Sequence, residues 1–340
     1  MNLDGSGLTR LTHLPGTDEF PFCSPDGKMI ALGSERPDGT TDIYLMNTDG
    51  SGLRNWTNNP ADDLHPCWSR DSTRIAFMSN RDGKYHIYVG HVSGPGLIQV
   101  TRGPADDEFP SWYSNVIAFA SNKYGDWEIC ITNDDGSTDP VRLTNHRGVD
   151  EFPFWSPDGR WLIYHSEIAG KTDLCVMRPD GGEWRNLTHS PASDQSSSWS
   201  PDGRWIAFMS DRDGNWNICK VRPDGSELTR LTENPEDDVY PSWFRDGQGL
   251  VFQRKGRRTG NSSLWTMNAE GGEEHRLTDD TADNGFVSWL LSPAETDSGT
   301  GAVSPRASGY ETHDEDNPPG RPSTGAMVDH RGACGCRCSL

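Results

Sequence analysis

Acidic residues with a regular spacing are the part of this sequence best suited to chemistry. An aspartate stands five residues before each of six positions that are usually tryptophan. The six are Asp18, Asp63, Asp107, Asp150, Asp194 and Asp238. Further acids stand next to them, at Glu19, Asp62, Asp106, Glu108, Glu151 and Asp237. Carboxylate oxygens bind hard cations such as Ca²⁺, and they attract Lys- and Arg-rich segments of other proteins.

These acids recur because the chain is built from one repeated unit. A threonine, usually preceded by leucine, closes each unit at intervals of 43 to 46 residues. The closing threonines are Thr12, Thr57, Thr101, Thr144, Thr188, Thr232 and Thr278. Repeats of this length occur both in propellers and in helical solenoids, so the density of turns must distinguish the two.

Each unit is dense in turns and holds four short apolar runs. The segment Trp155 to Gly159, Trp-Ser-Pro-Asp-Gly, returns at 199–203, and Asp-Gly pairs mark further turns. Asp-Gly between apolar runs is typical of tight β-hairpins, because glycine tolerates the positive φ that such turns require. No run of ten residues in the repeats lacks a turn signal, which excludes a helical repeat.

The sequence therefore predicts an all-β fold, a six-bladed β-propeller of four-stranded antiparallel blades around a central channel. The predicted blades span 18–57, 62–101, 106–144, 150–188, 194–232 and 237–278. Five tryptophans of the repeat should occupy equivalent places, namely Trp68, Trp112, Trp155, Trp199 and Trp243.

Both ends of the chain carry partial repeats. Residues 1–7 match residues 46–52 almost one for one, so the chain begins at the turn before a last strand, expected at 8–12. Residues 286–291 resemble a first strand, with Trp289 in the tryptophan position. Two interpretations follow. Either the spare strands close or extend a six-bladed ring, or the chain is a piece of a longer propeller protein.

The propeller domain is predicted to span residues 1–291. Residues 292–340 are polar, rich in Gly, Pro and Ser, and almost free of apolar side chains. Because such a composition cannot offset the entropy lost on ordering, we expect this segment to be a disordered tail. No signal peptide is recognisable at the start of the chain, and an upstream continuation of the protein would account for this.

Composition narrows the classes of partner. The formal net charge of -20 repels nucleic acid, so we expect no nucleic-acid partner. No apolar stretch approaches the roughly 18 residues of a membrane span. Cys130, Cys175 and Cys219 share one place in the repeat, which favours small buried side chains over disulfides. We expect the protein to be a monomer.

The repeat resembles a known family. Its pattern is D-x-x-P-x-W-S-P-D-G-x-x-I-A-F, then D-R-D-G-N, I-Y-x-M-N-x-D-G and R-L-T. Over residues 1 to about 291 this resembles the propeller repeats of the TolB family. Similar repeats occur in the propellers of prolyl-oligopeptidase-type peptidases and of the tricorn protease. The resemblance implies a periplasmic or extracellular propeller that binds other proteins of the cell envelope.

The place of the repeated aspartates predicts a candidate site. If the first strand is the innermost strand of each blade, the six aspartates form a ring at one mouth of the channel. Such a ring would bind a cation, with Ca²⁺ the best candidate, and the neighbouring acids would bind a basic peptide. In the alternative explanation, each aspartate bonds nearby backbone N–H groups as an Asx turn, which the repetition copies without a function.

Signatures of catalysis are missing. The sequence has no G-x-S-x-G elbow, no H-E-x-x-H and no phosphate-binding glycine loop, so we expect no catalytic residues. The predicted function is a non-enzymatic scaffold that binds a protein or peptide at an acidic channel mouth. The alternative is the propeller domain of a larger peptidase or hydrolase whose catalytic domain lies outside this chain.

Overall fold

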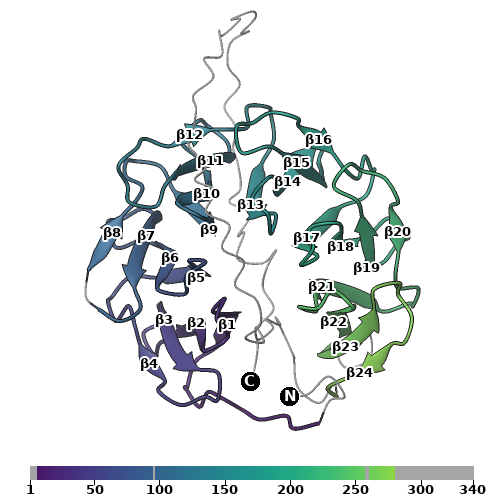
Figure 1. The fold of residues 1–340 in the computed structure, drawn as a ribbon, viewed down its shortest axis with the longest axis horizontal. Helices are drawn as coiled ribbons and strands as arrows, with labels where there is room; N and C mark the ends of the chain where they lie inside the picture. Colours follow the sequence, from purple (N-terminus) through teal and green to yellow (C-terminus); the bar gives the residue numbers. More distant parts are fainter. Residues whose placement is uncertain (1–5, 95, 257–259, 280–340) are drawn as a thin grey trace, which may run out of the picture.

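The computed structural model describes residues 6–94, 96–256 and 260–279. These residues form six four-stranded antiparallel sheets arranged around a central channel, and they contain no helix. Figure 1 shows the sheets in face view, following the chain around the channel. The predicted all-β, six-bladed β-propeller is therefore confirmed.

We number the blades along the chain, so that β1–β4 form blade 1 and β21–β24 form blade 6. The innermost strands are β1 (Asp18–Cys23), β5 (Asp63–Trp68), β9 (Asp107–Tyr113), β13 (Asp150–Trp155), β17 (Asp194–Trp199) and β21 (Asp237–Trp243). The second strands are β2 (Met29–Glu35), β6 (Arg74–Ser79), β10 (Val116–Ser121), β14 (Leu162–Ile168), β18 (Ile206–Ser210) and β22 (Gly249–Lys255). The third strands are β3 (Thr41–Asn47), β7 (His86–His91), β11 (Glu128–Asn133), β15 (Lys171–Met177), β19 (Asn217–Val221) and β23 (Ser262–Asn268). The short outermost strands are β4 (Arg54–Asn55), β8 (Leu97–Gln99), β12 (Val141–Arg142), β16 (Arg185–Asn186), β20 (Thr229–Arg230) and β24 (His275–Arg276).

Serine, aspartate and glycine build the turn between the first two strands of blades 1, 4 and 5. In blade 1 the Gly27 N–H donates to the Ser24 carbonyl over 2.9 Å, and Gly27 has a φ of +72°. The Ser24 hydroxyl donates to the Asp26 carboxylate over 2.7 Å and holds the turn from inside. At the equivalent Gly159 a Cβ would lie 2.1 Å from the Tyr113 ring of the preceding blade. The turn therefore needs glycine for its backbone and for blade packing.

The hydrophobic core lies between neighbouring blades. Between blades 3 and 4, for example, Ile129 and Ile131 of β11 pack against Leu162 and Tyr164 of β14. Four further clusters of the same kind fill the other junctions from blades 1–2 to blades 5–6, and a smaller cluster lies within blade 1 and against Leu11. Burial stabilises the fold by about 25 cal/mol for each Å² of apolar surface removed from water. Each blade therefore depends on its neighbours for stability.

Three cysteines lie in this core, as the repeat predicts. Cys130, Cys175 and Cys219 occupy the same place in β11, β15 and β19, and all three are buried free thiols. Burial raises the pKa of the Cys130 and Cys219 thiols to about 12. They serve as small apolar side chains.

The repeated tryptophans stand at or next to the end of the innermost strands and connect blades. The Trp68 indole N–H donates to the Phe22 carbonyl of blade 1 over 2.9 Å. The Trp155 indole makes the same bond to the Ser111 carbonyl of blade 3 over 3.0 Å. The Trp112 indole instead donates to the Ser114 carbonyl of its own blade over 3.1 Å, so the contact between neighbouring innermost strands is repeated in some blades only.

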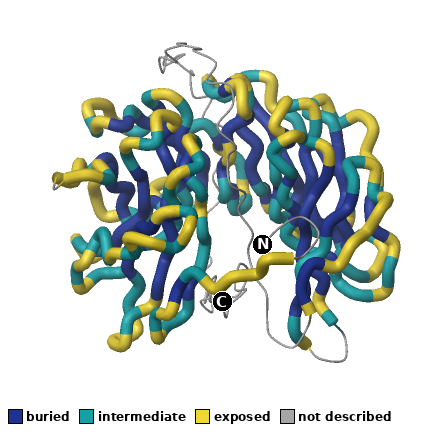
Figure 2. The backbone as a smooth tube through the Cα atoms, turned by 60° about the horizontal axis from the view of Figure 1, so that its bottom comes forward, coloured by how far each residue is buried: buried dark blue, intermediate teal, exposed yellow. Residues whose placement is uncertain are grey.

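Among the described strands, the ring of blades is interrupted at one place, between blade 6 and blade 1. Strands pack extensively against strands of the next blade at every junction from blades 1–2 to blades 5–6. Between the described strands of blade 6 and those of blade 1 no comparable strand contact exists. In Figure 2 the described part of the N-terminal segment crosses this interval. We call the interval the seam.

Two predicted segments lie outside the described residues: the spare first strand at 286–291 and the tail at 292–340. No helix within the described part of the chain has the length and apolar character needed to cross a membrane.

Candidate binding site in the central channel

The six repeated aspartates lie near the start of the innermost strands, and all are buried. Their partners come from their own blade and from the closing threonine before it. Asp18 accepts a hydrogen bond from the Thr12 hydroxyl over 2.6 Å. Asp194 forms an ion pair with Arg212 over 3.1 Å. These two carboxylates hold the start of their blades through side-chain donors, whereas the Asx-turn explanation expected backbone N–H donors.

Three of the neighbouring acids connect one blade to the next. Asp62 accepts a hydrogen bond from the Thr41 backbone N–H of blade 1 over 3.0 Å. Asp106 and Asp237 accept the equivalent N–H bonds, over 3.1 Å and 3.0 Å, from residues directly before β7 and β19. These three side chains bind the backbone of the preceding blade. The sequence analysis predicted that they bind a basic peptide.

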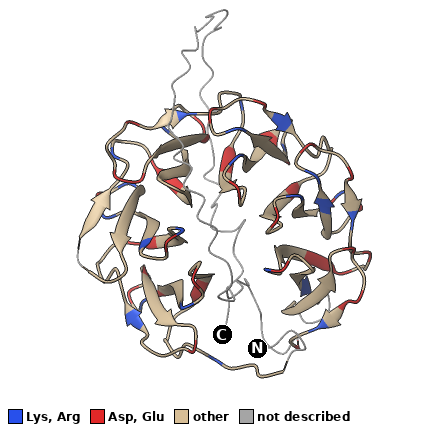
Figure 3. Cartoon of the chain, viewed as in Figure 1, with Lys and Arg blue, Asp and Glu red and all other residues tan. Residues whose placement is uncertain are grey.

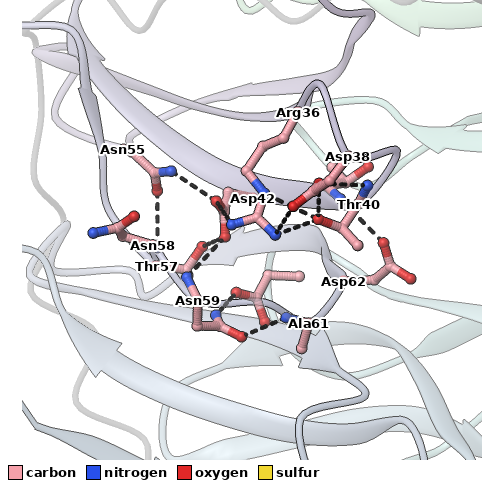
Figure 4. Close-up of polar contacts among 12 residues, drawn as sticks. Arg36, Asp38, Thr40, Asp42, Asn55, Thr57, Asn58, Asn59, Ala61 and Asp62 are labelled. Carbon is pink, nitrogen blue, oxygen red and sulfur yellow. Dashed lines mark hydrogen bonds and ion pairs between the residues drawn. The ribbon is translucent and has the colours of Figure 1, made fainter.

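A second set of buried acids begins the third strands, and the sequence prediction missed it. Figure 4 shows Asp42 at the junction of blades 1 and 2. Its carboxylate accepts hydrogen bonds from the Thr57 hydroxyl over 3.1 Å and from the Asn55 amide over 2.7 Å. Asp173 of blade 4 accepts equivalent bonds from the closing threonine and an asparagine, over 2.8 Å and 2.9 Å. In blades 1, 3 and 4 the closing threonine is thus held by a carboxylate of the third strand, from Asp42, Glu128 and Asp173.

The remaining predicted acids, Glu19, Glu108 and Glu151, follow the repeated aspartate on the innermost strand. Figure 3 shows acidic residues on several innermost strands as well as in the outer turns. Burial, together with the negative charges of Asp150 and Glu167, raises the pKa of Glu151 to about 7. Glu151 is therefore partly protonated at neutral pH.

Stability should depend on pH through Glu151. Its pKa rises from 4.5 to about 7 on folding, so its contribution is complete below pH 4.5 and is lost as the pH rises through 7. We expect the free energy of unfolding to fall by about 2 kcal/mol less between pH 5 and pH 8 in Glu151→Gln than in the parent. Urea unfolding at several pH values measures this. The exposed Glu273→Gln is the control, and equal pH slopes in all three proteins would contradict the assignment.

Calcium binding by the six aspartates stays a prediction. In the described part of the chain no group of three or more His, Cys, Asp and Glu side chains is placed to hold a metal ion. The prediction requires that millimolar Ca²⁺ raise the Tm of the protein by binding the folded state. The rise should vanish when Asp107, Asp150 and Asp238 are changed to Asn. Without a rise in the parent, the carboxylates have the structural role alone.

The channel is lined by six residues with an unusual backbone conformation, one in each blade. Two residues after each repeated aspartate, the backbone has a φ between +49° and +56°. The six residues are Phe20, His65, Phe109, Phe152, Ser196 and Tyr240, and we call them the channel residues. The pairing of first and second strands is irregular at this point in every blade. Such bulges change the direction in which a side chain points. A positive φ at a bulky residue is strained, and strained residues are typical of functional sites.

The channel residues form an aromatic surface across four blades. The rings of Phe20 and His65 lie 4.3 Å apart between centroids, and those of His65 and Phe109 lie 4.9 Å apart. The Phe109 and Phe152 rings follow at 4.0 Å, and His165 of β14 lies 5.3 Å beyond Phe152. We call this continuous surface of five rings the aromatic arc.

The arc lines a cavity of about 480 Å³. This volume lies within the range typical of ligand sites. The described residues that line it include no Asp, Glu, Lys or Arg. Burial lowers the pKa of His65 and of His165 to about 4, so both imidazoles are neutral at pH 7. The cavity is therefore uncharged, although the chain as a whole is strongly acidic.

One side of the cavity is polar. Blade 5 presents Ser196, Ser197 and Ser198 where the other blades present aromatic and proline residues. Ser197 is 9% exposed, and its hydroxyl has no hydrogen-bond partner within the described structure. The His165 Nε2 atom is likewise buried without a partner there. The cavity thus offers aromatic faces together with free hydrogen-bonding groups.

The fold and repeats are shared with known proteins. The family model of the TolB beta propeller domain matches residues 1–116 and 193–296, more than half of the chain. An uncharacterised protein of Agrobacterium fabrum is 38% identical over 50 residues, which are 15% of this chain and 17% of that protein. The matched segment is thus a small part of this relative.

Two solved structures extend the comparison. TolB from Acinetobacter baumannii is 21% identical with a TM-score of 0.57, covering 80% of this chain and 66% of TolB. A puromycin-hydrolyzing peptidase of Mycobacterium tuberculosis is 14% identical with a TM-score of 0.62, covering 83% of this chain and 48% of the peptidase. These structures share the fold, and the family model shows more: the chain belongs to the TolB beta propeller domain family.

Proposed function

We propose that this protein is a non-enzymatic scaffold that binds a segment of another protein at its central channel. The observation that carries the proposal is the set of six channel residues at positive φ. The same strained backbone is maintained in every blade, and it aims side chains at one cavity. A purely structural bulge would not require aromatic side chains at five of the six positions.

The chemistry of the cavity defines the segment that fits it. Aromatic faces favour an apolar or aromatic side chain of the partner, since aromatic pairs contribute about 0.5–1.5 kcal/mol beyond their buried area. The free Ser197 hydroxyl and the free His165 Nε2 atom favour hydrogen bonds from the same segment. Two rim residues, Phe22 and Phe154, are each 38% exposed and extend the apolar surface outward.

The acidic residues have a separate part in this proposal. Glu19, Glu108 and Glu151 lie on the innermost strands one residue before the channel residues, and none of them lines the cavity. At that end of the channel they would attract a basic flank of the partner, with binding that weakens as salt rises. As for other members of the family, we place the protein in the periplasm or outside the cell.

Two synthetic peptides test the proposal by calorimetric titration against the full chain. One is neutral and contains Trp and Leu, and the other alternates Lys and Gly. The neutral peptide should bind the parent and bind Phe152→Ser at least about tenfold more weakly, which corresponds to about 1.4 kcal/mol. Serine is a matched replacement, because blade 5 already has Ser196 at this position with a φ of +51°.

The control replaces an exposed aromatic residue away from the channel. Tyr124→Ser, at a position 38% exposed, should bind the neutral peptide as the parent does. The Lys-rich peptide should bind more weakly in 0.5 M than in 0.05 M salt, and Phe152→Ser should leave its affinity unchanged. Equal binding of the neutral peptide to the parent and to Phe152→Ser would reject the channel as the binding site.

A second candidate function is the propeller part of a larger hydrolase. The likeness to a peptidase of which this chain spans 48% supports it. Reading the gene across both ends of the chain decides between the two. A G-x-S-x-G segment in an adjoining α/β domain favours the hydrolase. A continuation without one favours the scaffold.

A further inference from the structure

Each innermost strand is an edge of its sheet, and five of the six innermost strands carry a proline at the same place. In every described sheet the innermost strand stands at the end of the strand order, and Figure 1 shows these strands bordering the channel. The residue directly after the channel residue is Pro21, Pro66, Pro110, Pro153 or Pro241. Proline has no backbone N–H, so it cannot donate to a further strand, and sheets use it to block pairing at their edges.

Blade 5 has a serine in place of this proline. Ser197 keeps both a backbone N–H and a hydroxyl. The residue before it, Ser196, has a φ of +51°, so the backbone turns here as it does in the other blades. Both residues lie at the bulge, outside the register of pairs between β17 and β18. Among the six described innermost strands, β17 alone therefore keeps a main-chain N–H at this point.

The side chain of Ser197 points to a ligand as well. Ser197 lines the cavity and is 9% exposed, and its hydroxyl has no hydrogen-bond partner in the part of the chain that the structure describes. A buried hydroxyl without a partner is costly, and a ligand that bonds to it removes this cost. The neighbours Ser196 and Ser198 also line the cavity, and their small side chains permit the close approach of another backbone.

We propose that the bound segment of the partner protein pairs with β17 as an extended strand along the channel edge of blade 5. The Ser197 N–H donates to a main-chain carbonyl of the segment, and the Ser197 hydroxyl bonds to a neighbouring main-chain amide. Addition of a strand to a free sheet edge is a common way to recognise a peptide. The inference rests on the proposed function, to which it adds the strand that receives the segment.

The proposal also places the side chains of the segment. A strand added at the edge of a sheet points its side chains alternately to the two faces of that sheet. One face of blade 5 lies against blade 4, since β17 packs against β14 and β15. There Phe152 and His165 end the aromatic arc, with ring centroids 5.3 Å apart. An apolar side chain on that face of the segment would lie against these two rings.

Ser197→Pro tests the proposal, because it gives blade 5 the residue that the other five blades have. Proline fits there after a residue with the same φ, so the variant should keep the Tm of the parent. In calorimetric titration of the full chain, the neutral Trp- and Leu-containing peptide should bind Ser197→Pro at least about tenfold more weakly than the parent. Ser197→Ala, which loses the hydroxyl and keeps the N–H, is the matched control and should bind about three- to fivefold more weakly.

Two N-methylated forms of the neutral peptide test strand pairing on the parent protein. Each form carries methyl groups on alternate amides, so one form loses the N–H groups that face β17 and the other loses those that face away from it. One form should bind at least about tenfold more weakly than the other. This measurement needs no variant, so it decides the matter even if Ser197→Pro does not fold.

The outcomes separate this inference from the proposed function. Equal binding of the two N-methylated forms would overturn the pairing with β17. Weaker binding by Phe152→Ser together with unchanged binding by a folded Ser197→Pro would also overturn it, while the channel would remain the binding site. Absence of any binding of the neutral peptide to the parent would reject both the pairing and the proposed function.

Discussion

Replacing Arg254 with methionine is expected to lower the free energy of unfolding by about 3–5 kcal/mol. The Arg254 guanidinium forms an ion pair with Asp238 over 2.6 Å, and the two side chains are 8% and 0% exposed. Without Arg254 the Asp238 carboxylate is left charged and unpaired in the protein interior. Urea unfolding followed by tryptophan fluorescence measures the loss.

A double variant tests whether the loss of stability comes from the unpaired charge of Asp238. Arg254→Met combined with Asp238→Asn removes both charges and should recover at least half of the lost stability. Arg230→Met is the matched control. Arg230 pairs with Asp213 and with Glu233 at the surface, so its loss should cost about 0–1 kcal/mol. If Arg254→Met and Arg230→Met destabilised the protein equally, the buried pair would have no special role.

Phe119→Ala is expected to cost about 3–5 kcal/mol, the loss typical of a large side chain removed from a core. Phe119 is fully buried between blades 2 and 3, where it packs with Val89 and Trp112. The cavity left behind would loosen the contact on which both blades depend. Thermal unfolding should therefore show a fall in Tm of roughly 6–15 °C.

The rim residue Phe154 provides the comparison for Phe119→Ala. Because Phe154 is 38% exposed, Phe154→Ala should change stability by less than about 1 kcal/mol. In the proposed function it should instead weaken binding of the neutral peptide. A loss of stability in Phe154→Ala as large as in Phe119→Ala would mean that the rim belongs to the core.

The fold could be predicted from the sequence because its signals are local and repeated. Turns such as Ser24 to Gly27 need only four residues to be recognised, and the repetition of the unit confirms each of them. The second and third strands between them are short runs buried along most of their length. The pattern of turns and strands is a weak signal in one repeat and a strong one in six. The number of blades and the place of the innermost strands could therefore be predicted.

The candidate site was harder to predict because it depends on a departure from the regular strand. A strand that alternates strictly would turn Phe20 and Phe22 to the same face. The bulge and the positive φ at Phe20 break that rule, and no period in the sequence reports a bulge. The signal available was the residue two places after each repeated aspartate, which is aromatic or histidine in five of six blades.

The role of the repeated aspartates could not be predicted either, since it depends on partners distant in sequence. Asp194 meets Arg212, 18 residues later, and Asp238 meets Arg254 across a strand pair. Repetition shows that a carboxylate is required at this place in the unit. Only the fold shows that the carboxylate is enclosed by its own blade.

The rate at which the three buried thiols of Cys130, Cys175 and Cys219 are alkylated would measure how often single blades open. Only a thiolate reacts with iodoacetamide, and the pKa of each thiol is raised by its burial. Alkylation of Cys130, Cys175 or Cys219 therefore waits for blade 3, 4 or 5 to separate from its neighbours. A ring that opens as one unit would give one common labelling rate for the three sites. Blades that open independently would give three, and mass spectrometry of the labelled peptides would distinguish them without altering a single residue.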